Sequence, residues 1–125
     1  MQAIIFDLTD SLGKKDIKQS IQVLKDLIVS KEPIQKILIT LYNHFKKLYI
    51  VKIAEKCNED LAMAMKLKPT QMFLVTKYKQ QAKYFSEEEL NKILKELVEL
   101  DKNYKVGLID LQIGLESILC RYCSK

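Results

Sequence analysis

Glycine and proline, the residues that most tight turns require, are scarce in this sequence. Its 125 residues contain three glycines and two prolines, and neither Asn-Gly nor Asp-Gly, the dipeptides typical of short β-hairpins, occurs. A β-rich fold needs many such turns, whereas a bundle of long helices needs few. The sequence therefore predicts an all-α fold, a compact bundle of six or seven helices with short connectors, in which residues 1–125 form a single domain.

The composition supports a buried core and argues against a membrane span. Hydrophobic residues make up 48% of the chain, but no run approaches the roughly 18 uncharged apolar residues that cross a bilayer. Asp7 and Asp10 interrupt the apolar N-terminal segment, so it does not have the pattern of a secretory signal. Three cysteines are an odd number, which favours free thiols in a reducing compartment. We expect a cytoplasmic protein.

The clearest helical pattern begins at Ser86. Ser86 and Glu89 have the spacing of a capping box, in which each side chain accepts a hydrogen bond from a free backbone N–H of the first turn. The acid-first pairs Glu88–Lys92 and Asp101–Lys105 are spaced to form ion pairs one helical turn apart. The predicted apolar stripe consists of Leu90, Ile93, Leu94, Leu97 and Tyr104.

Pro33 fits the first turn of a second long helix, which extends to Lys56. Its apolar residues cover so much of the circumference that we expect this helix at the centre of the bundle. The broad face comprises Ile34, Ile37, Leu38, Leu41, Phe45 and Leu48, widened by Ile39, Tyr42, Ile50 and Ile53.

Other helices are predicted from similar signals. Asp16 is placed to cap a helix whose expected buried positions are Ile17, Ile21, Leu24 and Ile28. Further helices are expected over Ile4–Leu12, ending at Gly13, and over Asn58–Lys66, Pro69–Phe85 and Ile109–Tyr122.

No arrangement of residues indicates catalysis. Cys120 and Cys123 form a CxxC at the C-terminal end of a predicted helix, where the dipole does not lower a thiol pKa; we expect Cys120 in the core and Cys123 near the chain end. A zinc site would need two more ligands, and Cys57 and His44 lack a suitable spacing. We expect His44, the only histidine, to be partly buried and hydrogen-bonded. The sequence thus predicts no enzyme, no cofactor and no metal.

Two stretches contain lysines but no acidic residue. No Asp or Glu occurs in residues 33–54 or in residues 61–86, and both stretches interleave lysine with aromatic residues. Such a pattern suits a phosphate-binding surface, although a solvated or partner-facing surface explains it as well. The candidate DNA-facing residues are Lys77, Lys79 and Lys83, of which Lys79 and Lys83 share one face of the predicted helix.

The segment Asp60–Val75 also resembles, loosely, a helix-turn-helix motif. Ala62 would be the small residue of the first helix, and Thr70 and Gln71 would open the recognition helix. Lys66 lies near the turn position that usually holds glycine, so an ordinary helical corner fits the same residues.

Several segments, in order along nearly the whole chain, resemble one protein family. They are Ile5–Leu12, Glu32–Ile34, Ile37–Leu38, Phe45–Leu48, Leu67–Lys77, Gln81–Ser86, Asp101–Gly107 and Leu115–Glu116. Their order and spacing resemble the C-terminal third of the delta subunit of bacterial DNA polymerase III, the clamp-loader subunit that opens the sliding clamp.

The resemblance implies a collar-like fold, in which a helical domain joins the other clamp-loader subunits in a ring. Family members carry an N-terminal ATPase-like module, and the resemblance places the start of this chain at the domain that follows it. We therefore expect this chain neither to hydrolyse ATP nor to contact the sliding clamp. The implied role is subunit assembly in support of clamp loading during DNA replication, with delta-prime and gamma/tau as partners and primer–template DNA nearby.

The resemblance also suggests which residues carry structure or contacts. We expect the last two helices and the long central helix to make the collar contacts, and Asp101, Lys105 and Gly107 to fix the end of a helix. The family-like structural positions are Phe6, Asp7, Asp10, Asp101, Lys105 and Gly107.

Two functions of different class remain. A collar domain predicts a complex with partner collar domains. A small helix-turn-helix protein predicts duplex DNA binding that survives physiological salt and is lost on Lys77→Glu or Gln71→Ala.

Overall fold

The computed structural model describes residues 10–57, 63, 68 and 73–123. Its helices are α2 (Ile17–Val29), α3 (Ile34–Lys56), α5 (Phe73–Ala82), α6 (Glu87–Lys105) and α7 (Leu111–Tyr122), and residues 10–13 are also helical. No strand occurs in these parts of the chain, so the predicted all-α fold is confirmed. The helix expected over Asn58–Lys66 falls almost wholly outside the described residues, as do Phe6 and Asp7.

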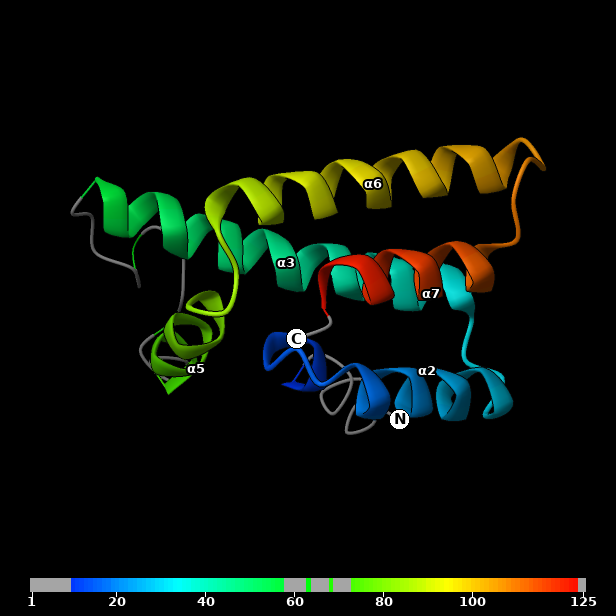
Figure 1. The fold of residues 1–125 in the computed structure, drawn as a ribbon, viewed down its shortest axis with the longest axis horizontal. Helices are drawn as coiled ribbons and strands as arrows, with labels where there is room; N and C mark the ends of the chain where they lie inside the picture. The colour runs from blue at the N-terminus through cyan, green and yellow to red at the C-terminus, as the bar shows by residue number, and fades with distance from the viewer. Residues whose placement is uncertain (1–9, 58–62, 64–67, 69–72, 124–125) are drawn as a thin grey trace.

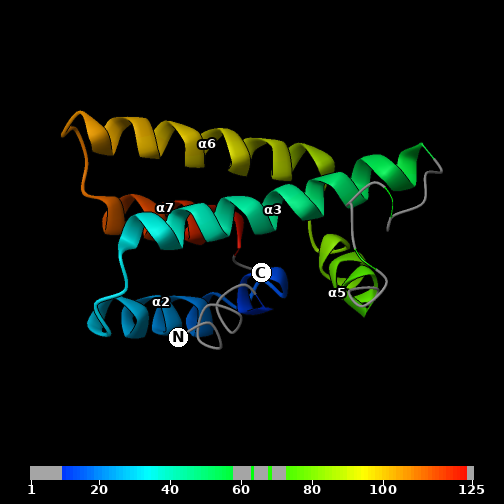
Figure 2. The same ribbon diagram turned by 180° about the vertical axis from the view of Figure 1, so that it is seen from behind.

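The long helix α3 is the centre of the bundle. It packs against α5, α6 and α7, whereas α2 packs against α7 (Figure 1). α6 runs antiparallel to α3 along one side, and α5 crosses near the C-terminal end of α3, as the reverse view also shows (Figure 2). The expectation that the Pro33–Lys56 segment forms a central helix is therefore correct.

One continuous hydrophobic core joins all of these helices. Phe45 of α3 is fully buried and meets Phe85 edge to face, with ring centroids 5.7 Å apart. On α3, one predicted core position is wrong: Ile39 is 60% exposed, because it lies on the side of the helix that α5, α6 and α7 leave uncovered. The largest fully buried side chains are Phe45, Leu12, Leu24, Leu27, Ile37, Leu41, Leu48, Leu90, Ile93, Leu97 and Leu115.

The buried face of α2 is rotated from the one that hydrophobicity predicts. Its buried residues are Ser20, Val23, Leu24 and Leu27, whereas Ile17, Ile21 and Ile28 are only partly buried. Ser20 can occupy the core because its hydroxyl donates to the backbone carbonyl of Asp16 at 2.7 Å. A buried serine that satisfies its own hydroxyl is not revealed by the pattern of apolar residues alone.

A similar correction applies to α6, where Leu100 is buried and the predicted core residue Tyr104 is exposed. The reason lies on α7: a Cβ atom added to Gly114 would collide with the Leu100 side chain. The absence of a side chain at Gly114 therefore gives Leu100 its place in the core.

The helix starts follow the capping signals of the sequence. The Ser86–Glu89 capping box is present, with both side-chain–backbone hydrogen bonds 3.0 Å long. The carboxylate of Asp16 accepts from the Gln19 N–H at 3.2 Å and so caps α2 as predicted. Asp110 caps α7 in the same way through the Ile113 N–H, which the sequence reading missed.

Three of the described helical segments are followed by a left-handed residue: Lys15 after residues 10–13, Lys31 after α2 and Gly107 after α6. Of these, Lys31 and Gly107 are exposed. After α6, the Gly107 N–H donates to Tyr104 and the Leu108 N–H to Asn103, with Gly107 at φ +78°. After α2, the Lys31 N–H donates to Ile28, with Lys31 at φ +62°. Both ends form the turn that favours glycine, because a Cβ atom is strained at positive φ.

We predict opposite effects of substitution at these two exposed positions. Gly107→Ala should lower the free energy of unfolding by about 1 kcal/mol, and Lys31→Gly should raise it by about 0.5–1 kcal/mol. Both positions adopt the left-handed conformation, so the first change adds a strained Cβ atom and the second removes one. A Cβ at Gly107 meets no atom within 4 Å, so no clash complicates the comparison. Urea denaturation measures both; a shift of the same sign in the two variants would contradict the prediction.

Candidate functional site

A connected row of polar side chains leads from the core to the surface beside α5. The Nε2 atom of His44 lies 2.7 Å from Oε1 of Gln81, and the Gln81 amide donates to Oδ1 of Asp10 at 3.3 Å. The same Asp10 oxygen accepts from the Lys77 ammonium at 2.7 Å. This network (His44, Gln81, Asp10 and Lys77) joins α3, α5 and the helical segment of residues 10–13.

His44 is held in its neutral form. Burial lowers the pKa of His44 from 6.5 to about 4; the hydrogen bond to Gln81 acts in the opposite direction, and the charge of Lys47 adds to the lowering. Because the Gln81 amide nitrogen donates to Asp10, its oxygen is the acceptor for His44, which places the imidazole proton on Nε2. The prediction of a buried, hydrogen-bonded histidine is confirmed. A histidine that stays neutral near pH 7 and is hydrogen-bonded in the core has a structural role rather than an acid–base role.

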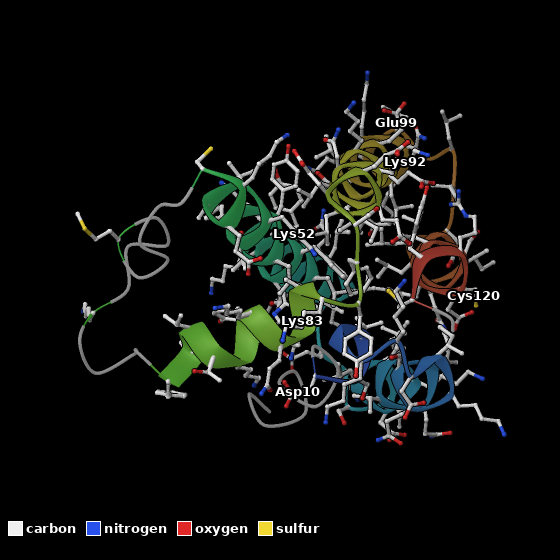
Figure 3. All side chains as sticks on the ribbon, turned by 60° about the vertical axis from the view of Figure 1, so that its left-hand side comes forward. Asp10, Lys52, Lys83, Lys92, Glu99 and Cys120 are labelled. Carbon is white, nitrogen blue, oxygen red and sulfur yellow. The ribbon has the colours of Figure 1, made fainter. Side chains whose placement is uncertain are left out.

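A basic pocket lies on the outer side of this network. It has a volume of about 540 Å³, and its lining residues are Asp10, Lys14, Lys77, Gln80, Gln81, Lys83 and Tyr84. Figure 3 shows Asp10 and Lys83 on the same side of the molecule, beside the end of α5. The structure thus brings two of the three candidate DNA-facing lysines together, adds Lys14 and leaves Lys79 exposed outside the lining.

The cysteines are placed opposite to the expectation. Cys120 is exposed and Cys123 is buried, because Cys123 continues the apolar face of α7 that Leu115 and Leu119 occupy. Burial raises the pKa of the Cys123 thiol to about 12, so it carries no thiolate at neutral pH. Within the described residues, no group of three His, Cys, Asp or Glu side chains is placed to hold a metal ion.

The family-like positions at the end of α6 make local contacts. Asp101 and Lys105 form an ion pair of 2.9 Å, and Gly107 supplies the left-handed turn after the helix. Asp10 belongs to the network described above.

Exposed apolar residues gather at the end of the bundle where α6 passes into α7 and α3 begins (Figure 1). We name two features there. The apolar tip consists of Val106, Leu108, Ile109 and Ile113, and Leu108 is 75% exposed. The α3–α6 groove, of about 190 Å³, is lined by Leu38, Ile39, Tyr42, Leu97, Val98 and Asp101. The sequence gives no direct sign of either, because a helical period alone does not show which apolar residues remain uncovered.

The fold and these surfaces define an all-α bundle domain. Among the described helices, none is long and apolar enough to be a membrane span. The sequence profile of the family described as "DNA polymerase III delta subunit, C-terminal domain" matches residues 2–122. The chain belongs to this family, which confirms the resemblance stated above.

A protein sequence and a solved structure from Bacillus subtilis are similar to the chain. DNA polymerase III subunit delta of strain 168 is 33% identical over 118 residues, which are 92% of this chain and 33% of that protein. The solved structure of the Bacillus subtilis DNA clamp loader delta protein matches with a TM-score of 0.78 and 27% identity, covering 96% of this chain and 35% of that chain. The chain therefore spans about a third of the length of these relatives.

The neutral state of His44 makes stability depend on pH. His44 has a pKa of about 6.5 when unfolded and about 4 when folded, so the unfolded chain binds the proton first as the pH falls. Its contribution to the free energy of unfolding is fully present above pH 6.5 and is lost between pH 6.5 and 4, by roughly 3 kcal/mol in total.

Denaturation in urea at a series of pH values checks this prediction, with His44→Gln as the control that cannot titrate. The wild type should lose more stability than His44→Gln over that pH range. An NMR titration in which the folded imidazole titrates near pH 6.5 would contradict the prediction.

Proposed function

We propose that this chain is the subunit-assembly (collar) domain of the delta subunit of the DNA polymerase III clamp loader. In this role it supports loading of the sliding clamp during DNA replication. Its partners are the other clamp-loader subunits, delta-prime and gamma/tau, and it acts in the cytoplasm close to primer–template DNA. The chain itself neither contacts the clamp nor catalyses a reaction.

Family membership carries this proposal. The family match spans almost the whole chain, and the structural match is to a protein named as a DNA clamp loader delta protein. What the geometry adds is consistent with a binding role: the one histidine is buried and neutral, and the one buried thiol has a raised pKa. Neither group is prepared for acid–base or nucleophilic chemistry.

The apolar tip and the α3–α6 groove are the surfaces that best suit subunit contacts. They lie on α3, α6 and α7, the helices that we expected to contact neighbouring subunits. Exposed apolar groups that gather at one end of a small domain are typical of protein–protein contacts, since covering them releases their hydration water. Val98 and Ile39 offer apolar area on the two sides of the groove, and Leu108 offers it at the tip.

The helix-turn-helix alternative has less support. Residues 60–62, 64–67 and 69–72 of that segment lie outside the described residues, and nothing in the family's description refers to such a motif.

We predict that polar substitution of these surfaces weakens assembly. Val98→Asp and Leu108→Asp should each lower the affinity for partner collar domains at least about tenfold, because each would place a charge in a desolvated contact. Size-exclusion chromatography of the mixed domains, followed by calorimetric titration, measures the effect.

Phe73→Asp is the matched control, because Phe73 is 70% exposed on α5 at a distance from both surfaces. It should leave the affinity unchanged. A chain that elutes alone from the mixture at micromolar concentration would overturn the proposed function. Equal loss of affinity in all three variants would overturn only the assignment of the interface.

A further inference from the structure

The basic pocket is a concave surface with an excess of positive charge among its described lining residues. Among the described residues, three lysines line it, Lys14, Lys77 and Lys83, together with one carboxylate, that of Asp10. Its volume of about 540 Å³ lies within the range of small-ligand sites. The proposed subunit contacts do not use it, since it is formed by α5 and the segment of residues 10–14 rather than by α6 and α7.

The Asp10 carboxylate is already engaged inside the wall of the pocket. Its Oδ1 atom accepts from the Lys77 ammonium at 2.7 Å and from the Gln81 amide at 3.3 Å. In the part of the chain that the structure describes, Lys14 and Lys83 have no carboxylate within ion-pair distance. The charges of Lys14 and Lys83 are therefore not balanced by a described carboxylate.

The surroundings strengthen this positive field. α5 contains no acidic residue, and the acid-free stretch of residues 61–86 includes the whole helix. Lys47 of α3 lies over the ring of Tyr78 at 5.6 Å and contributes to the lowered pKa of the buried His44 nearby. A second lysine-rich helix thus faces α5 from the core side.

Tyr84 gives the pocket an aromatic surface next to the lysines. Tyr84 is 47% exposed, so it is not a core residue, and it lines the pocket together with Lys83. Lysines bind phosphates as flexible point charges, and an exposed aromatic ring stacks on any base. Lysine charges on phosphates and a stacked ring bind a strand without reading its sequence, because neither contact recognises the edge of a base.

We propose that this pocket binds the phosphate backbone of single-stranded nucleic acid, with Lys14 and Lys83 on adjacent phosphates and Tyr84 stacked on a base. Lys77 is a positioning residue, because its charge is balanced by Asp10 and its role is to hold the pocket wall. This proposal rests on the proposed clamp-loader role only in identifying where the strand comes from. The phosphate and base contacts are inferred from the lining residues of the pocket.

Fluorescence anisotropy with a labelled 20-nucleotide oligo-dT tests the site on the whole chain. Lys14→Glu/Lys83→Glu should weaken binding at least tenfold. Its plot of log affinity against log salt concentration should be shallower by about 1.4, the value for two lost phosphate contacts on a single strand. Tyr84→Ala should weaken binding severalfold with an unchanged salt slope, and Tyr84→Phe should bind as the wild type does.

The control is Lys25→Glu/Lys95→Glu, on exposed positions of α2 and α6, which changes the net charge by the same amount. Equal weakening in this control would overturn the site, because binding would then follow net charge alone. Preference for duplex DNA, or release of the oligonucleotide by millimolar inorganic phosphate at constant ionic strength, would also overturn it. Association with partner collar domains is measured on the same variants, so failure of the pocket and failure of the proposed function are distinguished.

Discussion

The hydrogen bond between His44 and Gln81 determines where α5 can lie. His44 is a polar group on the buried face of α3, and a buried imidazole without a partner would cost roughly 1–3 kcal/mol. Its partner comes from 37 residues further along the chain and is itself buried, so α5 must present Gln81 at one position along α3. Apolar contacts between the same helices would tolerate several registers; this polar contact selects one.

The same polar contacts also fix residues at the surface, because both the oxygen and the nitrogen of the Gln81 amide are hydrogen-bonded. Its oxygen satisfies His44, and its nitrogen points to Asp10, which in turn holds Lys77. The helical segment of residues 10–13 is therefore fixed against α5 by the network that orders the core. The Lys15 side chain adds a second link, through its ion pair with Glu89 of α6 at 3.4 Å and its position over the Phe85 ring. The shape of the basic pocket follows from these polar links.

The local signals of the sequence were sufficient to predict the helices but not the contacts between them. A capping box or an Asp cap is decided within four residues, so the starts of α2 and α6 were predictable. The buried face of a helix depends on its neighbour: Ser20 is buried on α2 where Ile17, Ile21 and Ile28 are only partly so. On α6, Leu100 packs in the space that Gly114 of α7 leaves open. The candidate site shows the same limit, since Lys14 lies next to α5 only because distant segments are packed together.

The apolar tip and the basic pocket lie towards different ends of the bundle. The apolar tip lies where α6 passes into α7, whereas α5 crosses near the opposite end of α3 (Figures 1 and 2). With 23 residues, α3 spans about 35 Å between these ends, and its buried face is continuous along that length. A partner that covers the apolar residues would therefore leave the lysines and Tyr84 accessible. The apolar end has the chemistry of a lasting protein contact, and the basic end that of a reversible, salt-sensitive contact. Because α3 is one uninterrupted helix, a domain held by its apolar end presents the basic pocket at a fixed distance and orientation.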